Sequence, residues 1–109
     1  MPWHVSHYIA PEGEQNPYLD WLKSIRDTTA KVAIIRRMAR IELGNLGDHK
    51  FCRDGVWELR LDIGAGYRVY YALMTADHVL LLLGGTKPTQ RVDIQQAVNH
   101  WREWQRRPE

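Results

Sequence analysis

Several charged residues in the middle of the sequence have the chemistry to act on a phosphodiester. They are Glu58, Arg60, Arg68 and Lys87, with His49 and Lys50 nearby along the chain. A guanidinium group can hold phosphate oxygens through two parallel hydrogen bonds and can stabilise the extra negative charge of a transition state. A carboxylate or an imidazole can take up a proton. The set therefore suits RNA cleavage in which the substrate's own 2′-hydroxyl is the nucleophile.

That reaction needs three functions besides substrate binding. A base removes the proton of the 2′-hydroxyl, an acid protonates the leaving 5′-oxygen, and cations surround the phosphorus. Glu58 or His49 could be the base. The cations could be Arg60, Arg68 and Lys87, and Lys87 is also a candidate proton donor.

The same charges have a purely structural interpretation. Glu58 and Arg60 alternate along one expected strand, and Arg68 lies on the strand that follows it. Ion pairs across neighbouring strands are common in antiparallel sheets. The residue pattern alone leaves both interpretations open, cross-strand salt bridges and a phosphate site.

Other chemistries find little support in the sequence. The His, Cys, Asp and Glu residues do not have the spacing of metal ligands, and no Ser/His/Asp arrangement stands out. The segment 84–88 lacks the GxxxxGK[ST] spacing of a phosphate-binding loop. Cys52, the single cysteine, is interpreted as a quiet thiol, and it favours a reducing compartment because it cannot form an internal disulfide. We expect no metal ion and no cofactor.

Alternating hydrophobicity predicts the sheet that would position these side chains. Strands are expected at 56–63, 67–74 and 79–83, separated by short turns. In the first two strands the apolar residues share one face, so Arg60 and Arg68 share the opposite, open face. The third run is apolar on both faces, as expected of a central strand. A further strand is expected at 3–9, whereas 46–54 are expected to form a loop.

Helical periodicity predicts helices before and after this sheet in the chain. Asn16 and Pro17 begin a short helix, Asp27 caps a second one, and Gly44 follows its end. Thr89 is expected to cap a last helix with an apolar stripe. The fold class expected is α+β, with a small antiparallel sheet of about four strands packed against an N-terminal helical hairpin, plus a C-terminal helix.

Length and composition indicate one globular domain over residues 1–109. Hydrophobic residues make up 44% of the chain and charged residues 26%, which is ordinary for a folded protein. The net charge of +2 permits nucleic-acid binding without requiring it. No signal peptide is visible, and the longest apolar run is too short to cross a bilayer, so a cytoplasmic protein without membrane partners is expected.

Two long segments resemble a known family. GNLGDHKFCRDGVWELRLDIGAGYRVYY begins at Gly44, and VLLLLGGTKPTQRVDIQQA begins at Val79. Together they resemble the addiction-module killer proteins, which are HigB-like, phage-related members of the RelE/ParE toxin superfamily. The combination of GYRVYY with GGTKxxQxxDIxxA is the specific feature. The resemblance extends over nearly the whole chain, from Trp21 to Trp104.

This resemblance implies a toxin that cleaves mRNA, typically on the ribosome, and leaves a 2′,3′-cyclic phosphate. It implies a cognate antitoxin as partner, often one with a helix-turn-helix domain. Arg68, the arginine of the GYR motif, matches the residue that binds phosphate in RelE-like toxins, and Arg60 and Lys87 match further basic positions. The cations expected to contact the rest of the RNA are Lys50, Arg53 and Arg91.

Two other functions stay open. The ParE branch of the same superfamily inhibits DNA gyrase instead of cleaving RNA, so a shared fold does not decide the activity. A catalytically degenerate toxin that only binds another protein is the third alternative.

Overall fold

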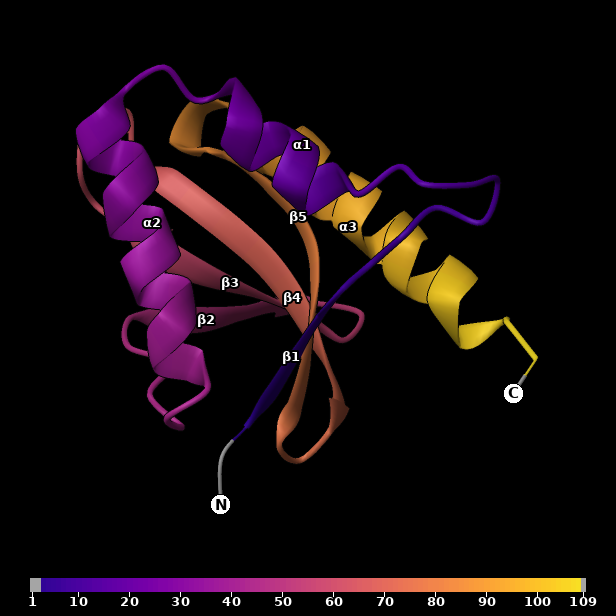
Figure 1. Ribbon diagram of the computed structural model, residues 1–109. Helices are drawn as coiled ribbons and strands as arrows, with labels where there is room; N and C mark the ends of the chain where they lie inside the picture. Colours follow the sequence, from indigo (N-terminus) through magenta and orange to yellow (C-terminus); the bar gives the residue numbers. More distant parts are fainter. Residues whose placement is uncertain (1–2, 109) are drawn as a thin grey trace.

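The computed structural model describes residues 3–108, and its centre is a five-stranded sheet with the order β1-β5-β4-β3-β2 (Figure 1). The strands are β1 (His4–His7), β2 (His49–Arg53), β3 (Val56–Leu61), β4 (Tyr67–Thr75) and β5 (His78–Thr86). With the three helices described below, the fold class is α+β, as the sequence predicts.

Two details of the sheet differ from the expectation of about four antiparallel strands. Strands β2 to β5 form an antiparallel meander, but β1 pairs with β5 in parallel, so the sheet is mixed. The strand that was not expected is β2, which lies within 46–54, where the sequence predicted a loop. Its residues are exposed or half-buried because it forms one edge of the sheet, and an exposed edge strand shows no buried alternation.

The β2–β3 hairpin turns at Asp54 and Gly55. Both residues have positive φ angles, 52° and 83°, which is the backbone of a two-residue type I′ turn. Asp-Gly is a preferred sequence for that turn because Gly accepts this conformation without a steric penalty. This dipeptide is the sequence signal from which strand β2 could have been inferred.

The two N-terminal helices begin where the sequence predicts. Helix α1 (Pro17–Ser24) starts after Asn16, whose side chain accepts a hydrogen bond from Leu19 N at 3.0 Å. Helix α2 (Thr28–Ile41) starts after Asp27, whose side chain accepts one from Ala30 N at 3.2 Å. Each side-chain oxygen satisfies a backbone N–H that has no partner within the helix.

Helices cover both faces of the sheet. The sequence predicted that one face would be open, and this prediction is wrong. On one face, α1 and α2 pack against residues such as Leu59, Val69 and Leu81. On the other face, helix α3 (Gln90–Gln105) packs through Ala97 and Val98 against alternate residues of the same strands. This arrangement explains why β5 is apolar on both faces.

Helix α3 follows directly from a short 3₁₀ helix, η1 (Lys87–Thr89). The sequence predicted that Thr89 caps α3, but its side chain makes no capping hydrogen bond to that helix. Its hydroxyl instead accepts a hydrogen bond from Thr86 N at 3.3 Å and closes the preceding 3₁₀ turn. None of the helices in residues 3–108 is both long enough and apolar enough to cross a lipid bilayer.

Close packing against the sheet requires a glycine at position 84. The indole of Trp21, in α1, lies so near that a Cβ atom on Gly84 would be 2.0 Å from Trp21 Cε3. We expect Gly84→Ala to lower the free energy of unfolding by about 1–3 kcal/mol, because a rigid ring cannot yield without moving the helix. Urea unfolding measures this change.

Repeating the substitution in a Trp21→Ala variant distinguishes the loss of this contact from a general effect of alanine in a strand. In Trp21→Ala, the additional cost of Gly84→Ala should fall well below its cost in the wild type. An equal cost in both backgrounds would contradict the packing described here.

The C-terminal turn of α3 is fixed to the segment after β1 by three polar side chains. Tyr8 Oη donates to Glu103 Oε1 at 2.7 Å, and Arg107 Nε donates to Glu103 Oε2 at 2.8 Å. Arg107 also donates to the carbonyl of Ile9 at 2.6 Å. The hydrogen bonds from Arg107 and Tyr8 lower the pKa of the Glu103 carboxyl from 4.5 to about 2.

This lowered pKa makes the contribution of Glu103 dependent on pH. A depressed carboxyl pKa stabilises the fold above the unfolded value of 4.5, and that stabilisation is lost as the pH falls toward 2. We expect Glu103→Gln to cost about 1 kcal/mol at neutral pH, a figure reduced because the pair is partly exposed. The difference from the wild type, measured by urea unfolding, should shrink steadily below pH 4.5. The exposed Glu12→Gln should change stability at neutral pH by less than about 0.5 kcal/mol. A Glu103→Gln difference that stays constant with pH would refute the assignment.

Candidate functional site

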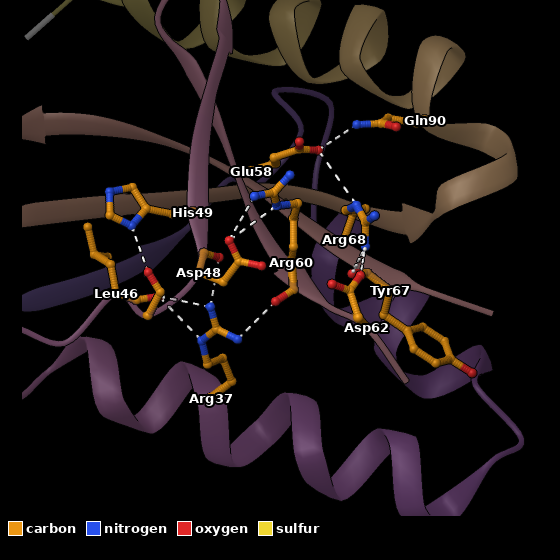
Figure 2. A network of polar contacts seen from close by, with 11 residues as sticks. Arg37, Leu46, Asp48, His49, Glu58, Arg60, Asp62, Tyr67, Arg68 and Gln90 are labelled. Atoms are coloured by element: carbon orange, nitrogen blue, oxygen red, sulfur yellow. Dashed lines mark hydrogen bonds and ion pairs between the residues drawn. The ribbon is translucent and has the colours of Figure 1, made fainter. Parts of the chain in front are cut away.

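A guanidinium from α2 holds the loop that leads into β2. Arg37 Nη2 donates to the carbonyls of Leu46 at 3.1 Å and Asp48 at 2.8 Å, and Nη1 donates to the carbonyl of Arg60 at 3.0 Å (Figure 2). Arg37 lies outside the apolar stripe of α2, so the helix pattern alone would leave it in solvent, whereas the structure uses it to bind three backbone carbonyls. Arg37 connects α2, the loop and β3, and thereby fixes where β2 begins.

The side chain of Asp48, in that loop, pairs with Arg60. Arg60 Nη2 donates to Asp48 Oδ1 at 2.8 Å, and Nε donates to the same oxygen at 3.3 Å. This hydrogen bond lowers the pKa of the Asp48 carboxyl and raises the pKa of the Arg60 guanidinium. Arg60 is therefore already neutralised by an exposed carboxylate.

Glu58 and Arg68 form a buried pair beneath the start of α3. Their side chains are 3% and 6% exposed, and Arg68 Nε lies 3.8 Å from Glu58 Oε2. Arg68 Nη1 also donates to the carbonyl of Tyr67 at 3.0 Å and approaches Asp62 Oδ1 at 3.4 Å. Gln90, the first residue of α3, donates from Nε2 to Glu58 Oε2 at 2.7 Å. The pair thus ties β3, β4 and α3 together.

The hydrogen bonding of this pair is incomplete. Arg68 Nε and Tyr70 Oη are buried, and neither makes a hydrogen bond among the described residues. Gln90 and Arg68 both approach the same oxygen of Glu58, Oε2, and Figure 2 draws no contact between Oε1 and the other residues shown there. A buried donor without a partner is costly, so the pair contributes less to stability than a fully hydrogen-bonded pair would.

A groove of about 820 Å³ lies between the edge strand β2 and the first half of α3. Glu58 contributes to its lining from β3. The cations along it are Lys50, Arg53 and Arg91, and the amides along it are Gln90, Gln95, Gln96 and Asn99. Apolar side chains complete the lining, among them Ile94 and the exposed Val92. The groove is positively charged at its rim and has a carboxylate in its lining.

The eight site residues expected from the sequence fall into separate groups. Four of them line the groove, namely Glu58, Lys50, Arg53 and Arg91. Arg68 is buried beside Glu58. Arg60 is directly opposite Arg68 in the β3–β4 register, so the two arginines lie on the same face of the sheet. The sequence predicted this shared face correctly, but Arg68 is buried where an exposed position was expected.

Lys87 and His49 lie outside the groove lining. The backbone N–H of Lys87 donates to the carbonyl of Gly66 at 2.7 Å, at the hairpin before β4. A Cβ atom on Gly66 would be 3.3 Å from Lys87 Cβ and 3.7 Å from Arg68 Nη1, so Lys87 emerges beside Arg68. His49 is opposite Leu59 in the register and therefore lies on the other face of the sheet from Glu58.

Sequence reasoning missed the residues that hold the site in place. Arg37, Asp48, Asp62 and Gln90 were not selected, because each acts through a partner that is distant in the sequence. The sequence did contain a weak signal for the groove residues that α3 contributes. Arg91, Gln95 and Asn99 recur every four residues, and this spacing places them in one line along a helix.

Other chemistry at this site is limited. Burial raises the pKa of the Cys52 thiol to about 11, so it is not a ready nucleophile, in agreement with the sequence-based interpretation. Residues 3–108 contain no group of three or more His, Cys, Asp or Glu side chains placed to hold a metal ion.

Comparison with known proteins places the chain in a family. Residues 20–99 match the family described as phage-derived protein Gp49-like (DUF891). The chain belongs to this family. Its members are addiction-module killer-like, toxin-like proteins, which agrees at this level with the resemblance in the sequence. The narrower resemblance to HigB and RelE stays a prediction.

A relative of this Gp49-like chain occurs in Haemophilus influenzae. It is described as an uncharacterized protein and is 47% identical over 77 residues. The matched segment covers 71% of this chain and 78% of the relative.

The Arg37 contacts predict a large difference between two neighbouring arginines of α2. Arg37→Gln removes hydrogen bonds to three backbone carbonyls, and we expect it to lower the free energy of unfolding by about 1.5–3 kcal/mol. Arg36→Gln is the matched control, because Arg36 is exposed and makes no ion pair within residues 3–108; its change should stay below about 0.5 kcal/mol. Urea unfolding compares them, and similar losses would contradict the role assigned to Arg37.

Proposed function

We propose that this Gp49-like protein is the toxin of a type II toxin–antitoxin pair and that it cleaves RNA. The observation that carries the proposal is the buried Glu58–Arg68 pair, with its incomplete hydrogen bonding, beside a groove with a basic rim. The family of addiction-module killer-like proteins supports the biological role. The substrate proposed is mRNA, with the ribosome as the place of cleavage, and the partner proposed is a cognate antitoxin with a helix-turn-helix domain.

The scissile phosphate binds at the guanidinium of Arg68. Asp62 is the most exposed partner of that group, with 75% of its side chain exposed, so a phosphate oxygen replaces it at Nη1. A guanidinium binds two oxygens of one phosphate and stabilises the charge that develops on them. Lys87 emerges on the same side and adds a second cation.

Cleavage follows from attack of the 2′-hydroxyl on phosphorus. Glu58 Oε1 accepts the proton of the hydroxyl, a bond forms between the 2′-oxygen and phosphorus, and the bond from phosphorus to the 5′-oxygen breaks. Lys87 delivers a proton to the leaving 5′-oxygen. The products are a 2′,3′-cyclic phosphate and a free 5′-hydroxyl. The nucleophile belongs to the substrate, so the step needs no cofactor.

The groove holds the nucleotides that flank the scissile phosphate. Lys50 and Arg91 neutralise backbone phosphates there, and such contacts bind RNA without regard to sequence, whereas Arg53 is already paired with Asp54. Arg60 is not given a direct role, because Asp48 neutralises it.

Two conservative substitutions test the reaction. Arg68→Lys keeps the charge but loses the two-pronged contact with phosphate, and Glu58→Gln keeps the shape but removes the base. We expect each to reduce cleavage of a reporter mRNA in a translation reaction by about a hundredfold or more. Mapping of RNA ends by primer extension measures the cleavage, and urea unfolding verifies that both variants fold.

Asp62→Asn provides the matched control at the same guanidinium. It removes a competitor for phosphate, so its cleavage should equal or exceed that of the wild type. Folded Arg68→Lys and Glu58→Gln variants with wild-type cleavage would exclude the assigned site. Growth arrest with DNA damage and intact mRNA would exclude RNA cleavage and favour inhibition of gyrase. Normal growth without an antitoxin would favour a degenerate protein-binding domain.

A further inference from the structure

The wall of the groove that α3 provides is rich in amide side chains. Gln95 and Asn99 are four residues apart and therefore follow one another along the helix, and both line the groove. Their carbonyl and amino ends differ in hydrogen bonding: the oxygen only accepts and the nitrogen only donates. What such a wall can recognise depends on which end of each amide faces the groove.

An arginine from the opposite wall fixes the orientation of the first amide. Arg53 Nη2 donates to Gln95 Oε1 across the groove. Arg53 Nη1 in turn donates to Asp54 Oδ2 at 2.6 Å, at the type I′ turn, so the guanidinium is held at both ends. Arginine has no acceptor, and only the carbonyl oxygen of Gln95 can face it. The amino end of Gln95 must then point along the helix.

The second amide takes its orientation from the first. Gln95 Nε2 donates to Asn99 Oδ1 at 3.0 Å, which turns the oxygen of Asn99 toward Gln95. Asn99 Nδ2 therefore faces away from Gln95, and within residues 3–108 no acceptor for its N–H groups is found. The chain of bonds from Arg53 to Asn99 ends in a pair of N–H donors at the groove.

A pair of N–H donors discriminates between the two purine bases. Guanine carries two adjacent acceptors on one edge, O6 and N7, whereas adenine carries the acceptor N7 beside a donating amino group at position 6. Single-stranded RNA exposes these edges because its bases are not paired. The end of this hydrogen-bond chain matches guanine and opposes the amino group of adenine.

We infer that Asn99 is a specificity-determining residue of the groove and that it favours guanine over adenine in single-stranded RNA. This inference rests on the proposal that the groove holds RNA. Arg53 and Gln95 are positioning residues in it, since they set the direction of the Asn99 amide without contacting the base.

Short 2′-O-methyl RNA oligonucleotides test the selection apart from cleavage, because they lack the nucleophilic hydroxyl. The probes are an oligoadenylate and the same oligomer with one central guanosine, and their dissociation constants are compared at low ionic strength, where phosphate contacts are strong. The wild type should bind the guanosine probe roughly fivefold more tightly or better. A probe with inosine keeps O6 without the 2-amino group and should bind like the guanosine probe.

Substitution of one atom should reverse the preference. Asn99→Asp replaces the donor by an acceptor, so the ratio of the two affinities should change in favour of the oligoadenylate, although the added negative charge weakens binding of both probes. Asn99→Ala should bring the ratio near one. Gln96→Ala is the matched control, because Gln96 lines the same groove outside the hydrogen-bond chain, and it should leave the ratio unchanged.

The outcomes separate this inference from the proposed reaction. A ratio that is the same in the wild type and in Asn99→Asp overturns the inference even if the wild type cleaves reporter mRNA. Failure of the wild type to bind either probe also overturns it. Guanosine selection that depends on Asn99, in a protein that leaves mRNA intact, upholds the base-reading site and overturns the proposed cleavage.

Discussion

The ion pair between Glu58 and Arg68 is the constraint on which the arrangement of this protein depends. Because helices cover both faces of the sheet, the pair lies in a poorly solvated interior, where each charge needs the other. Removing one partner of such a pair costs roughly 3–5 kcal/mol. The antiparallel register of β3 and β4 sets the two residues on the same face, and Gln90 fixes the start of α3 over the carboxylate. The groove exists because α3 begins at that point and continues past the edge strand.

The two arginines on the same face of the sheet, Arg60 and Arg68, differ in how completely their guanidinium groups are paired. Arg60 is neutralised by Asp48, whose own position is set by Arg37, so a structural interpretation accounts for it fully. Arg68 is more deeply buried, yet its Nε makes no hydrogen bond among the described residues, and its exposed partner Asp62 is held only loosely. Burial without full pairing is unfavourable for stability alone. Sites that violate local rules in this way are where function is expected.

The sequence predicted the parts of this structure that local patterns control. Alternation placed Arg60 and Arg68 on one face, and capping residues located the starts of α1 and α2. It could not predict that α3 covers the face of Arg68, because the apolar stripe of a helix does not specify which face of a sheet receives it. The same limit hid the role of Arg37, since an arginine on a helix surface and one bound to three distant carbonyls have the same local sequence.

The position of α3 also connects the two halves of the site. Its first residue, Gln90, contacts the buried carboxylate, and five and nine residues later Gln95 and Asn99 line the groove. The type I′ turn at Asp54 and Gly55 holds Arg53 against the same helix, and Gly55 lies so near Trp101 that a Cβ atom would be 2.7 Å from its Nε1. A helix fixed at both ends in this way cannot shift along its axis without breaking a contact. In the proposed function, one rigid element therefore sets the geometry of both phosphate binding and base recognition.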